Sequence, residues 1–373
     1  MTPVPSSLDL NTSSTTDLRD AQSGFSQGVA LTTAEMPSST SFQHDLDCAV
    51  DAVRQSLLST VTSTTSEILG ELAAYYASRP SKQMRPRLVL LLAQATATEF
   101  SPISRKHLCL AEIVEMIHVA SLLHDDVLDN AATRRGDISA PAKYGNKSTV
   151  LTGDFLLAKL MTLAVSLGNW EVAQEIPEMI GELIEGELRQ AEGAHDALRA
   201  AGTLIQGTNY DILWANYINR IYLKTGTLFA RSGKCSVLLH KDISQDVIDS
   251  AYEYGRNLGI AFQIVDDILD FTGDECLGKP HGNDLRDGII TAPVLFALEE
   301  SADMQDIFSR GFSQPGDIDK AICIVNSTQA LQRSEQMAVE YAERACLSIS
   351  NLKSSSAKTA LEALSKWITV RRH

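Results

Sequence analysis

Apolar residues recur at helical spacing through most of this chain. From about residue 44 onward they return every three or four positions, which is the period of one face of an α-helix. Helices are expected over 45–77, 84–97, 104–131, 148–167, 170–195, 211–239, 244–272, 285–300, 328–350 and 356–370. No strand-type alternation is sustained, and Gly and Pro fall mostly between these segments. The pattern predicts an all-α, single-domain helical bundle around a central cavity.

The N-terminal segment has a different composition from the rest. Residues 1–43 are rich in Ser and Thr, and we expect a disordered tail there, followed by one domain over 44–373. Asp9, Asp17 and Asp20 stand against the single Arg19, whereas a mitochondrial presequence is rich in Arg and poor in acids. We therefore expect a cytoplasmic protein.

Charge and cysteine usage narrow the class of protein. The formal net charge of −15 over 373 residues argues against a nucleic-acid binder, which needs a basic surface. An anionic substrate remains compatible if metal ions mediate its binding. The six cysteines form no CxxC pair, which is typical of reduced thiols in an intracellular protein. No apolar stretch is expected to reach the length of a membrane-spanning helix.

Two motifs of the form Asp-Asp-x-x-Asp carry the chemistry, at 125–129 and 266–270. Residues four apart share a helix face, so Asp125 stacks near Asp129 and Asp266 near Asp270. Such carboxylates repel each other unless a cation joins them. Without Cys or His at metal-ligand spacing, the pattern favours Mg²⁺, which takes one or two carboxylates per ion and fills its remaining positions with water and substrate phosphates. The alternative is a solvated acidic face, but apolar runs lead directly into both motifs.

Basic and polar groups near these motifs suit an anionic ligand. Arg134 and Arg135 follow the first motif, and planar guanidinium groups match phosphate oxygens. His118 lies seven residues before Asp125 and so shares its helix face, although a lone helical His is more often a core residue. A solvated basic turn is the alternative for the arginine pair.

Three further segments add candidate ligands for an anion. Lys82 and Arg85 stand at a helix start, where the helix dipole favours anions over cations, so an anionic ligand would resolve the conflict. Lys224-Thr225 interrupts an apolar run with small polar groups. Gln263 precedes the second motif on the same helix, and Lys279 follows that motif in a Gly-Lys-Pro loop.

The order of these segments resembles one known family. The segments are EMIHVASLLHDDVLDNAATRRG, GNKSTVLTGDFLLAKL, YLKTGTLFA and YEYGRNLGIAFQIVDDILDFTGDECLGKPHGNDLRDGIITAPVLFALEE. Over roughly residues 75–300 the chain resembles the all-trans polyprenyl (isoprenyl) diphosphate synthases, with the long-chain and mitochondrial-type members nearest. The resemblance implies a prenyltransferase that condenses isopentenyl diphosphate with an allylic diphosphate by Mg²⁺-assisted ionisation, in an expected homodimer with about three ions per site.

The resemblance also implies roles for individual residues. Asp125, Asp129 and Asp266 would bind Mg²⁺. The other motif acids, Asp126, Asp267 and Asp270, would support the metal ligands directly or through water. Arg134, Lys224, Thr225, Gln263 and Lys279 would hold the allylic diphosphate. The diphosphate of isopentenyl diphosphate would be held by Lys82, Arg85, His118 and Arg135.

Product length is expected to depend on the helix that carries the first motif. Ala120 and Ser121, just before Asp125, are small, so the bulky aromatic that blocks elongation early in this family is missing. On the facing helix, Leu160 and Met161 replace the small residues usual in the nearest relatives, and they would either narrow the tunnel or pack between helices. A short product such as geranyl or farnesyl diphosphate for a specialised terpenoid or meroterpenoid pathway is one expectation, with a long polyprenyl product as the other.

Three alternative functions stay open from the sequence. A class I terpene cyclase shares the first acidic motif, but its second metal motif usually carries Asn, Ser and Glu. A non-catalytic regulatory subunit of a prenyl synthase would be expected to lose acids or basic ligands. A metal phosphohydrolase built on His124-Asp125 would need further His ligands, for which the chain shows no pattern.

Overall fold

The computed structural model describes residues 39–79, 81–97, 103–134, 136–203, 210–272 and 282–371, with the side chains of 39–40 and 192–203 outside that description. Its long helices are α2 (Ser39–Thr62), α3 (Glu67–Ala77), α4 (Met84–Ala95), α5 (Arg105–Leu128), α7 (Asn146–Ser166), α8 (Trp170–Thr203), α9 (Tyr210–Ile221), α10 (Thr227–Leu238), α11 (Gln245–Thr272), α15 (Asp317–Ser327), α16 (Ala330–Ser348) and α17 (Ser356–Val370). Shorter elements are α6 (Ala140–Tyr144), α12 (Asn283–Arg286), α13 (Ala292–Glu300), α14 (Ala302–Ser309), the π-helical segment η3 (Tyr222–Gly226) and the antiparallel pair β1 (Thr133–Arg134) and β2 (Asp137–Ile138).

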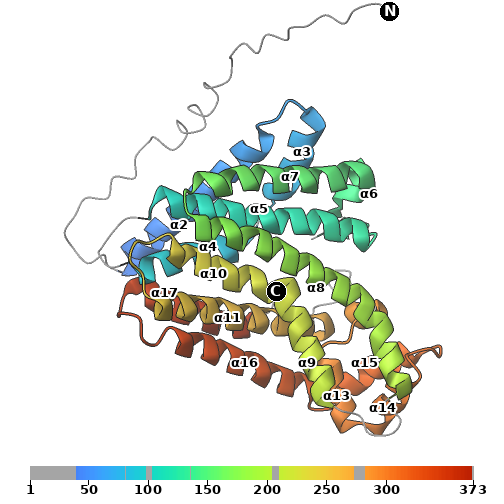
Figure 1. Ribbon diagram of the computed structural model, residues 1–373. Coiled ribbons are helices and arrows are strands. Elements are labelled where there is room, and N and C mark those ends of the chain that lie inside the picture. Colours follow the sequence, from blue (N-terminus) through green and yellow to red (C-terminus); the bar gives the residue numbers. More distant parts are fainter. Residues whose placement is uncertain are drawn as a thin grey trace, which may run out of the picture. The chain divides into compact units, whose positions relative to one another are not determined.

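The helices from α2 onward form one bundle, so the predicted all-α architecture is confirmed. Helix α11 packs between α10 and α16, and α4 packs against α5, α10 and α17. Helix α7 covers α5, and α8 runs along α10 and η3 (Figure 1). Segment η3 packs against both α8 and α11. The C-terminal ends of α5 and α11 carry the two acidic motifs.

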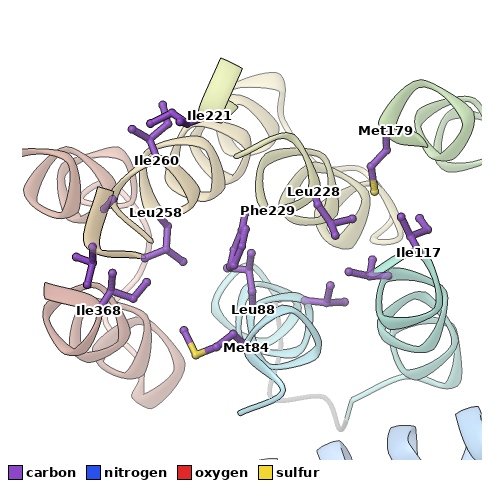
Figure 2. Packing of buried hydrophobic residues seen from close by; sticks show 14 of the residues in the cluster. Met84, Leu88, Ile117, Met179, Ile221, Leu228, Phe229, Leu258, Ile260 and Ile368 are labelled. Carbon is purple, nitrogen blue, oxygen red and sulfur yellow. The ribbon is translucent and has the colours of Figure 1, made fainter. Parts of the chain in front are cut away.

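The core is built from the apolar stripes of these helices. Phe229 of α10 points toward Leu88 of α4, with Leu228 and Ile117 on one side and Leu258 and Ile368 on the other (Figure 2). Phe229, Leu88 and Leu258 have no measurable exposure to solvent. Each fully buried large apolar side chain stabilises the fold by roughly 1.5–3 kcal/mol. The resulting core is the rigid frame that fixes the positions of the helix ends.

Local chemistry sets both ends of α5. The Ser104 hydroxyl accepts a hydrogen bond from the backbone N–H of His107 at 3.3 Å, which caps the N-terminus. At the other end, Asn130 has a φ of +48°, and the N–H of Ala131 bonds to the carbonyl of Asp126 at 2.9 Å. This is a Schellman-type ending, in which a left-handed residue closes the last turn. The first acidic motif is therefore held on a sharply terminated helix.

The observed boundaries differ from the sequence prediction in a few places. The helix expected over 45–77 is two helices, because the Ser/Thr run at 62–66 breaks it and the Ser66 hydroxyl caps α3. The helix expected over 211–239 contains η3, and the one expected over 285–300 is divided into α12 and α13. The short β1–β2 pair and helices α6, α14 and α15 were not predicted. The first described helix begins at Ser39, inside the expected N-terminal tail.

The expectation that no segment is long and apolar enough for a membrane span was wrong. In the described part of the chain, α5 and α7 both meet that criterion by length and composition. However, 67% of the most apolar window of α5 is buried within the bundle, as in core helices of soluble proteins, whereas for α7 the fraction is 33%. Helix α7 thus leaves an apolar face uncovered.

Candidate active site

The first acidic motif divides into an inward and an outward part. Asp126 is fully buried and accepts hydrogen bonds from the Tyr76 hydroxyl and, at 2.6 Å, from Nε of Arg134. Asp125 is half-buried and Asp129, the C-cap of α5, is exposed. Asp126 therefore orients Arg134, while Asp125 and Asp129 keep access to solvent.

The outer carboxyls of this motif sit in an unfavourable electrostatic environment. Burial, followed by the negative charge of Glu187, raises the pKa of Asp125 to about 7. Desolvation also raises the pKa of Asp129, although the Lys224 ammonium acts in the opposite direction. Both groups therefore gain from a cation that offsets desolvation and mutual repulsion.

The second motif, at the end of α11, shows the same division. Asp267 is buried and accepts hydrogen bonds from the Tyr217 hydroxyl at 2.6 Å and from Nε2 of Gln263 at 2.9 Å. Asp266, with a side chain 40% exposed, forms an ion pair with Arg371. Asp267 is thus fixed by its neighbours, and Asp266 faces a cation that comes from the end of the described chain.

Asp270 has a structural partner. Its two carboxylate oxygens accept hydrogen bonds from the backbone N–H groups of Asn283 and Asp284, each at 3.1 Å. A carboxylate at the N-terminus of α12 satisfies donors that the helix leaves unpaired. Burial and the charges of Asp267 and Asp270 raise the pKa of Asp284 to about 8, which adds a further carboxyl to this end of the bundle.

Segment η3 carries two of the predicted ligands, Lys224 and Thr225. The positive charge of Lys224 opposes the rise in the pKa values of Asp125 and Asp129, and it also acts on Asp284 beside the second motif. Thr225 donates to Oε1 of Gln263 at 2.7 Å, so a chain of hydrogen bonds runs from η3 through Gln263 to Asp267. The wide turn of a π-helical segment, a frequent feature of functional sites, thus carries Lys224 close to the first motif and to Asp284.

Other predicted ligands lie around this centre, and two fall outside the description. The charges of Arg85 and Lys82 act on Asp266, and these side chains lie over the rings of Phe229 and Trp367, at 4.9 and 4.8 Å. His118 is half-buried on α5, two turns before Asp125. Arg135 and Lys279 are outside the described residues.

The donor set fits a hard divalent cation completed by a ligand. The side chains with solvent access, Asp125, Asp129 and Asp266, offer only oxygen atoms, as Mg²⁺ prefers. Among the described residues no group of three His, Cys, Asp or Glu side chains is already gathered for a metal. Phosphate oxygens of a substrate would supply the missing ligands. His124 contacts the Val150 carbonyl of α7 at 3.2 Å, which gives no support to the phosphohydrolase alternative.

Comparison with known proteins decides the family. The polyprenyl synthetase family model matches residues 66–325. A protein named prenyl transferase from Cyanophora paradoxa is 39% identical over 306 residues, which cover 82% of this chain and 90% of the relative. The chain belongs to the polyprenyl synthetase family.

Solved structures agree with this family assignment. Heptaprenyl diphosphate synthase from Staphylococcus aureus has a TM-score of 0.79 at 28% identity and covers 88% of this chain and 99% of its own. A polyprenyl synthase from Caulobacter crescentus, solved with calcium and isoprenyl diphosphate, has a TM-score of 0.75 at 26% identity, with 91% and 100% covered. This polyprenyl synthetase family member is a prenyltransferase, and its family is Mg²⁺-dependent in general. The synthase reading is favoured over the cyclase and regulatory-subunit alternatives.

Sequence analysis missed three charged residues of the site in this polyprenyl synthetase family member. Glu187 of α8 pairs with Lys224, Arg371 pairs with Asp266, and Asp284 lies beside the second motif. Glu187 and Asp284 belong to segments with several acids, and Arg371 adjoins another Arg. The local sequence around these residues therefore did not distinguish them from ordinary charged residues on a solvated surface. Only the packing of α8, α12 and the C-terminal residues against the motifs shows their place.

Replacing Asp125 with Asn should stabilise the metal-free protein at pH 8. Because the pKa of Asp125 is raised from 3.8 to about 7, its stabilising protonation is complete below pH 4 and is lost as the pH rises through 7. At pH 8 the wild type therefore carries an unfavourable charge that Asn lacks, and the difference should shrink at pH 5. Thermal unfolding in EDTA measures it.

A matched variant checks the specificity of this effect. Asp51→Asn makes the same chemical change on an exposed part of α2 and should leave the pH dependence of the melting temperature unchanged. A melting temperature of Asp125→Asn equal to that of wild type at pH 8 would contradict the assigned environment of Asp125.

Proposed function

We propose that this chain joins isopentenyl diphosphate to an allylic diphosphate and releases diphosphate and a longer, linear all-trans prenyl diphosphate. The observation that carries the proposal is the position of Lys224, whose charge acts on Asp125 and Asp129 of the first motif and on Asp284 beside the second. Two acidic helix ends around one cation, with Arg134 on one side and Lys82 and Arg85 on the other, suit two diphosphate groups bound close together.

The first step of the proposed reaction breaks the allylic C–O bond. Divalent cations held by Asp125, Asp129 and Asp266, about three per site, would supply positive charge to the leaving diphosphate. Arg134, fixed by Asp126, and Lys224 would bind the same leaving group. These cationic groups are oriented before the reaction, so they stabilise the developing charge without large rearrangement.

The second step joins the two substrates. Lys82, Arg85 and His118 would hold isopentenyl diphosphate so that its C=C bond attacks the allylic cation, after which a proton is lost. Several residues before Asp125 on α5 are apolar and buried, including Ala120, Ile117 and Ile113. Apolar walls exclude water, which would otherwise quench the cation.

A product assay tests this function. The protein should convert isopentenyl diphosphate and geranyl, farnesyl or geranylgeranyl diphosphate into linear prenyl diphosphates with Mg²⁺, and EDTA should abolish the reaction. Asp266→Ala should lower turnover by at least ~100-fold, because a group that stabilises developing charge is lost. Asp246→Ala, an exposed acid in the first turn of the same helix, should retain normal turnover. A cyclic hydrocarbon product, or normal turnover by Asp266→Ala, would reject the proposal.

Product length in this proposal is set along α5 beneath Asp125. Ala120 is buried, and Ser121 is half-buried with its hydroxyl on the His118 carbonyl. Leu160 is fully buried in the stripe of α7 that packs with the core, whereas Met161 is only partly buried. Small residues near the acids leave room for a growing tail, and the solved neighbour from S. aureus is named for a heptaprenyl product. These features favour a long product.

Ala120→Phe should shorten the product, since the ring fills space just below the acids. Ala302→Phe, an equal change at an exposed position of α14, should leave the product unchanged. Chromatography of dephosphorylated products measures chain length.

A Leu160→Ala/Met161→Ala double variant tests the facing helix. If the folded variant makes a longer product, these residues limit the growing tail. If the product length is unchanged, they belong to core packing. Such cavities cost roughly 2–5 kcal/mol per residue, so folding is measured in parallel.

The proposed enzyme is a homodimer that pairs through α7 and α8. These helices pack against each other and expose large apolar side chains, Leu151 (51%), Val165 (75%), Ile184 (62%) and Leu188 (58%). Ile184 and Leu188 are one turn apart on α8 and share a face. Exposed apolar side chains on two helices that pack together are typical of protein–protein contacts.

Light scattering during size exclusion should give twice the mass of one chain. Leu151→Glu/Leu188→Glu should give one chain mass, because two charges would be buried at the interface. Leu347→Glu, at a 69% exposed position of α16, should remain dimeric. A monomeric wild type would disprove the dimer, and dissociation by Leu347→Glu would place the contact elsewhere.

A further inference from the structure

Helix α8 touches η3 backbone to backbone. A Cβ atom added to Gly186 would lie 2.4 Å from the amide nitrogen of Lys224 and 2.8 Å from its Cα, both too close for any side chain. On the other side of η3, a Cβ on Gly259 of α11 would lie 2.7 Å from Cα of Gly226. Glycines on two helices therefore hold η3 between them, and they fix the position of Lys224 relative to α8.

The residue after Gly186 makes use of this close approach. Oε2 of Glu187 lies 2.8 Å from Nζ of Lys224, and their side chains are 20% and 26% exposed. The negative charge of Glu187 also acts on Asp125 and Asp129. Lys224 thus has anions on two sides: Glu187 on α8 and the outer carboxyls of the first motif on α5.

The Lys224 ammonium in this position could form an ion pair with the anions on either side. Paired with Asp125 and Asp129, it would neutralise the carboxylates that a divalent cation needs. Paired with Glu187, it stays within reach of the site and leaves those carboxylates open. The observed ion pair is the second arrangement. A compact, strongly hydrated ammonium on a flexible stem can then move to a phosphate oxygen when one arrives.

On the basis of the function proposed above, we propose that Glu187 is a positioning residue, which holds Lys224 away from Asp125 and Asp129 until a diphosphate takes the ammonium. Glu187 does not touch the reacting atoms in this role. It acts through Lys224, and it keeps the first acidic motif available for divalent cations before substrate binds.

The test is Mn²⁺ binding to the full chain without substrate, measured by electron paramagnetic resonance. In Glu187→Gln the anionic neighbours left to Lys224 include the motif carboxylates Asp125 and Asp129. Lys224 then competes with the metal, and Mn²⁺ affinity should fall about 10-fold, as when an outer-shell partner is lost. Removing the competitor as well, in Lys224→Ala/Glu187→Gln, should restore the affinity to within about threefold of wild type. This rescue separates positioning from a structural role.

Glu185→Gln is the matched control. It removes the same charge from the same helix, but Glu185 is 51% exposed and paired with Arg189. Its Mn²⁺ affinity should equal that of wild type. Circular dichroism and thermal unfolding verify that each variant is folded, and a misfolded Glu187→Gln that the double variant does not rescue would make Glu187 structural and overturn the proposal.

Each remaining result has a definite meaning. Wild-type Mn²⁺ affinity in Glu187→Gln, an equal loss in Glu185→Gln, or no rescue in the double variant overturns the role of Glu187. An active wild type that binds no Mn²⁺ before substrate overturns it too. Prenyl transfer by the wild type is assayed in the same preparation, so an inactive wild type identifies failure of the proposed function instead.

Discussion

Repulsion among carboxylates at the ends of two helices is the constraint on which the rest of the site depends. Helices α5 and α11 each end in three aspartates, and burial makes their charges costly. The structure offsets this cost with cations from other elements: Arg134 at Asp126, Arg371 at Asp266, and Lys224 near both motifs. The negative charge of the site is thus partly offset by its own side chains, and a ligand must exchange these partners for its own.

Exposure divides the six motif aspartates by task. Asp126 and Asp267 are buried and accept hydrogen bonds from tyrosine hydroxyls. Asp270 accepts hydrogen bonds from backbone N–H groups at the N-terminus of α12. Such fully bonded carboxylates orient the groups that bond to them. Asp125 and Asp266 are left half-exposed and Asp129 exposed, with incomplete compensation of their charges. The proposed metal ligands are therefore those acids that the fold leaves accessible.

Close backbone packing makes this division geometrically possible. Besides Gly186 and Gly259, a Cβ on Gly255 of α11 would lie 2.3 Å from the carbonyl oxygen of Phe229. Helices α10 and α11 consequently approach closely, and Thr225 of the adjoining segment η3 reaches Gln263 of α11. Dense packing of this kind resists small shifts, so the hydrogen-bonded chain to Asp267 remains fixed while the long cationic side chains can move.

The sequence by itself determined the all-α class, most helix positions and the family. Helical periodicity and the order of the motifs depend only on the order of residues along the chain. It also identified both acidic motifs and most of the basic residues around them. It did not determine the π-helical turn at Lys224, the breaks at 62–66 and 287–291, or the partners of each aspartate. These depend on which helices pass each other and how closely. Glu187 and Arg371 lie about 60 and 105 positions from the acids they face, and only tertiary packing brings such distant charges together.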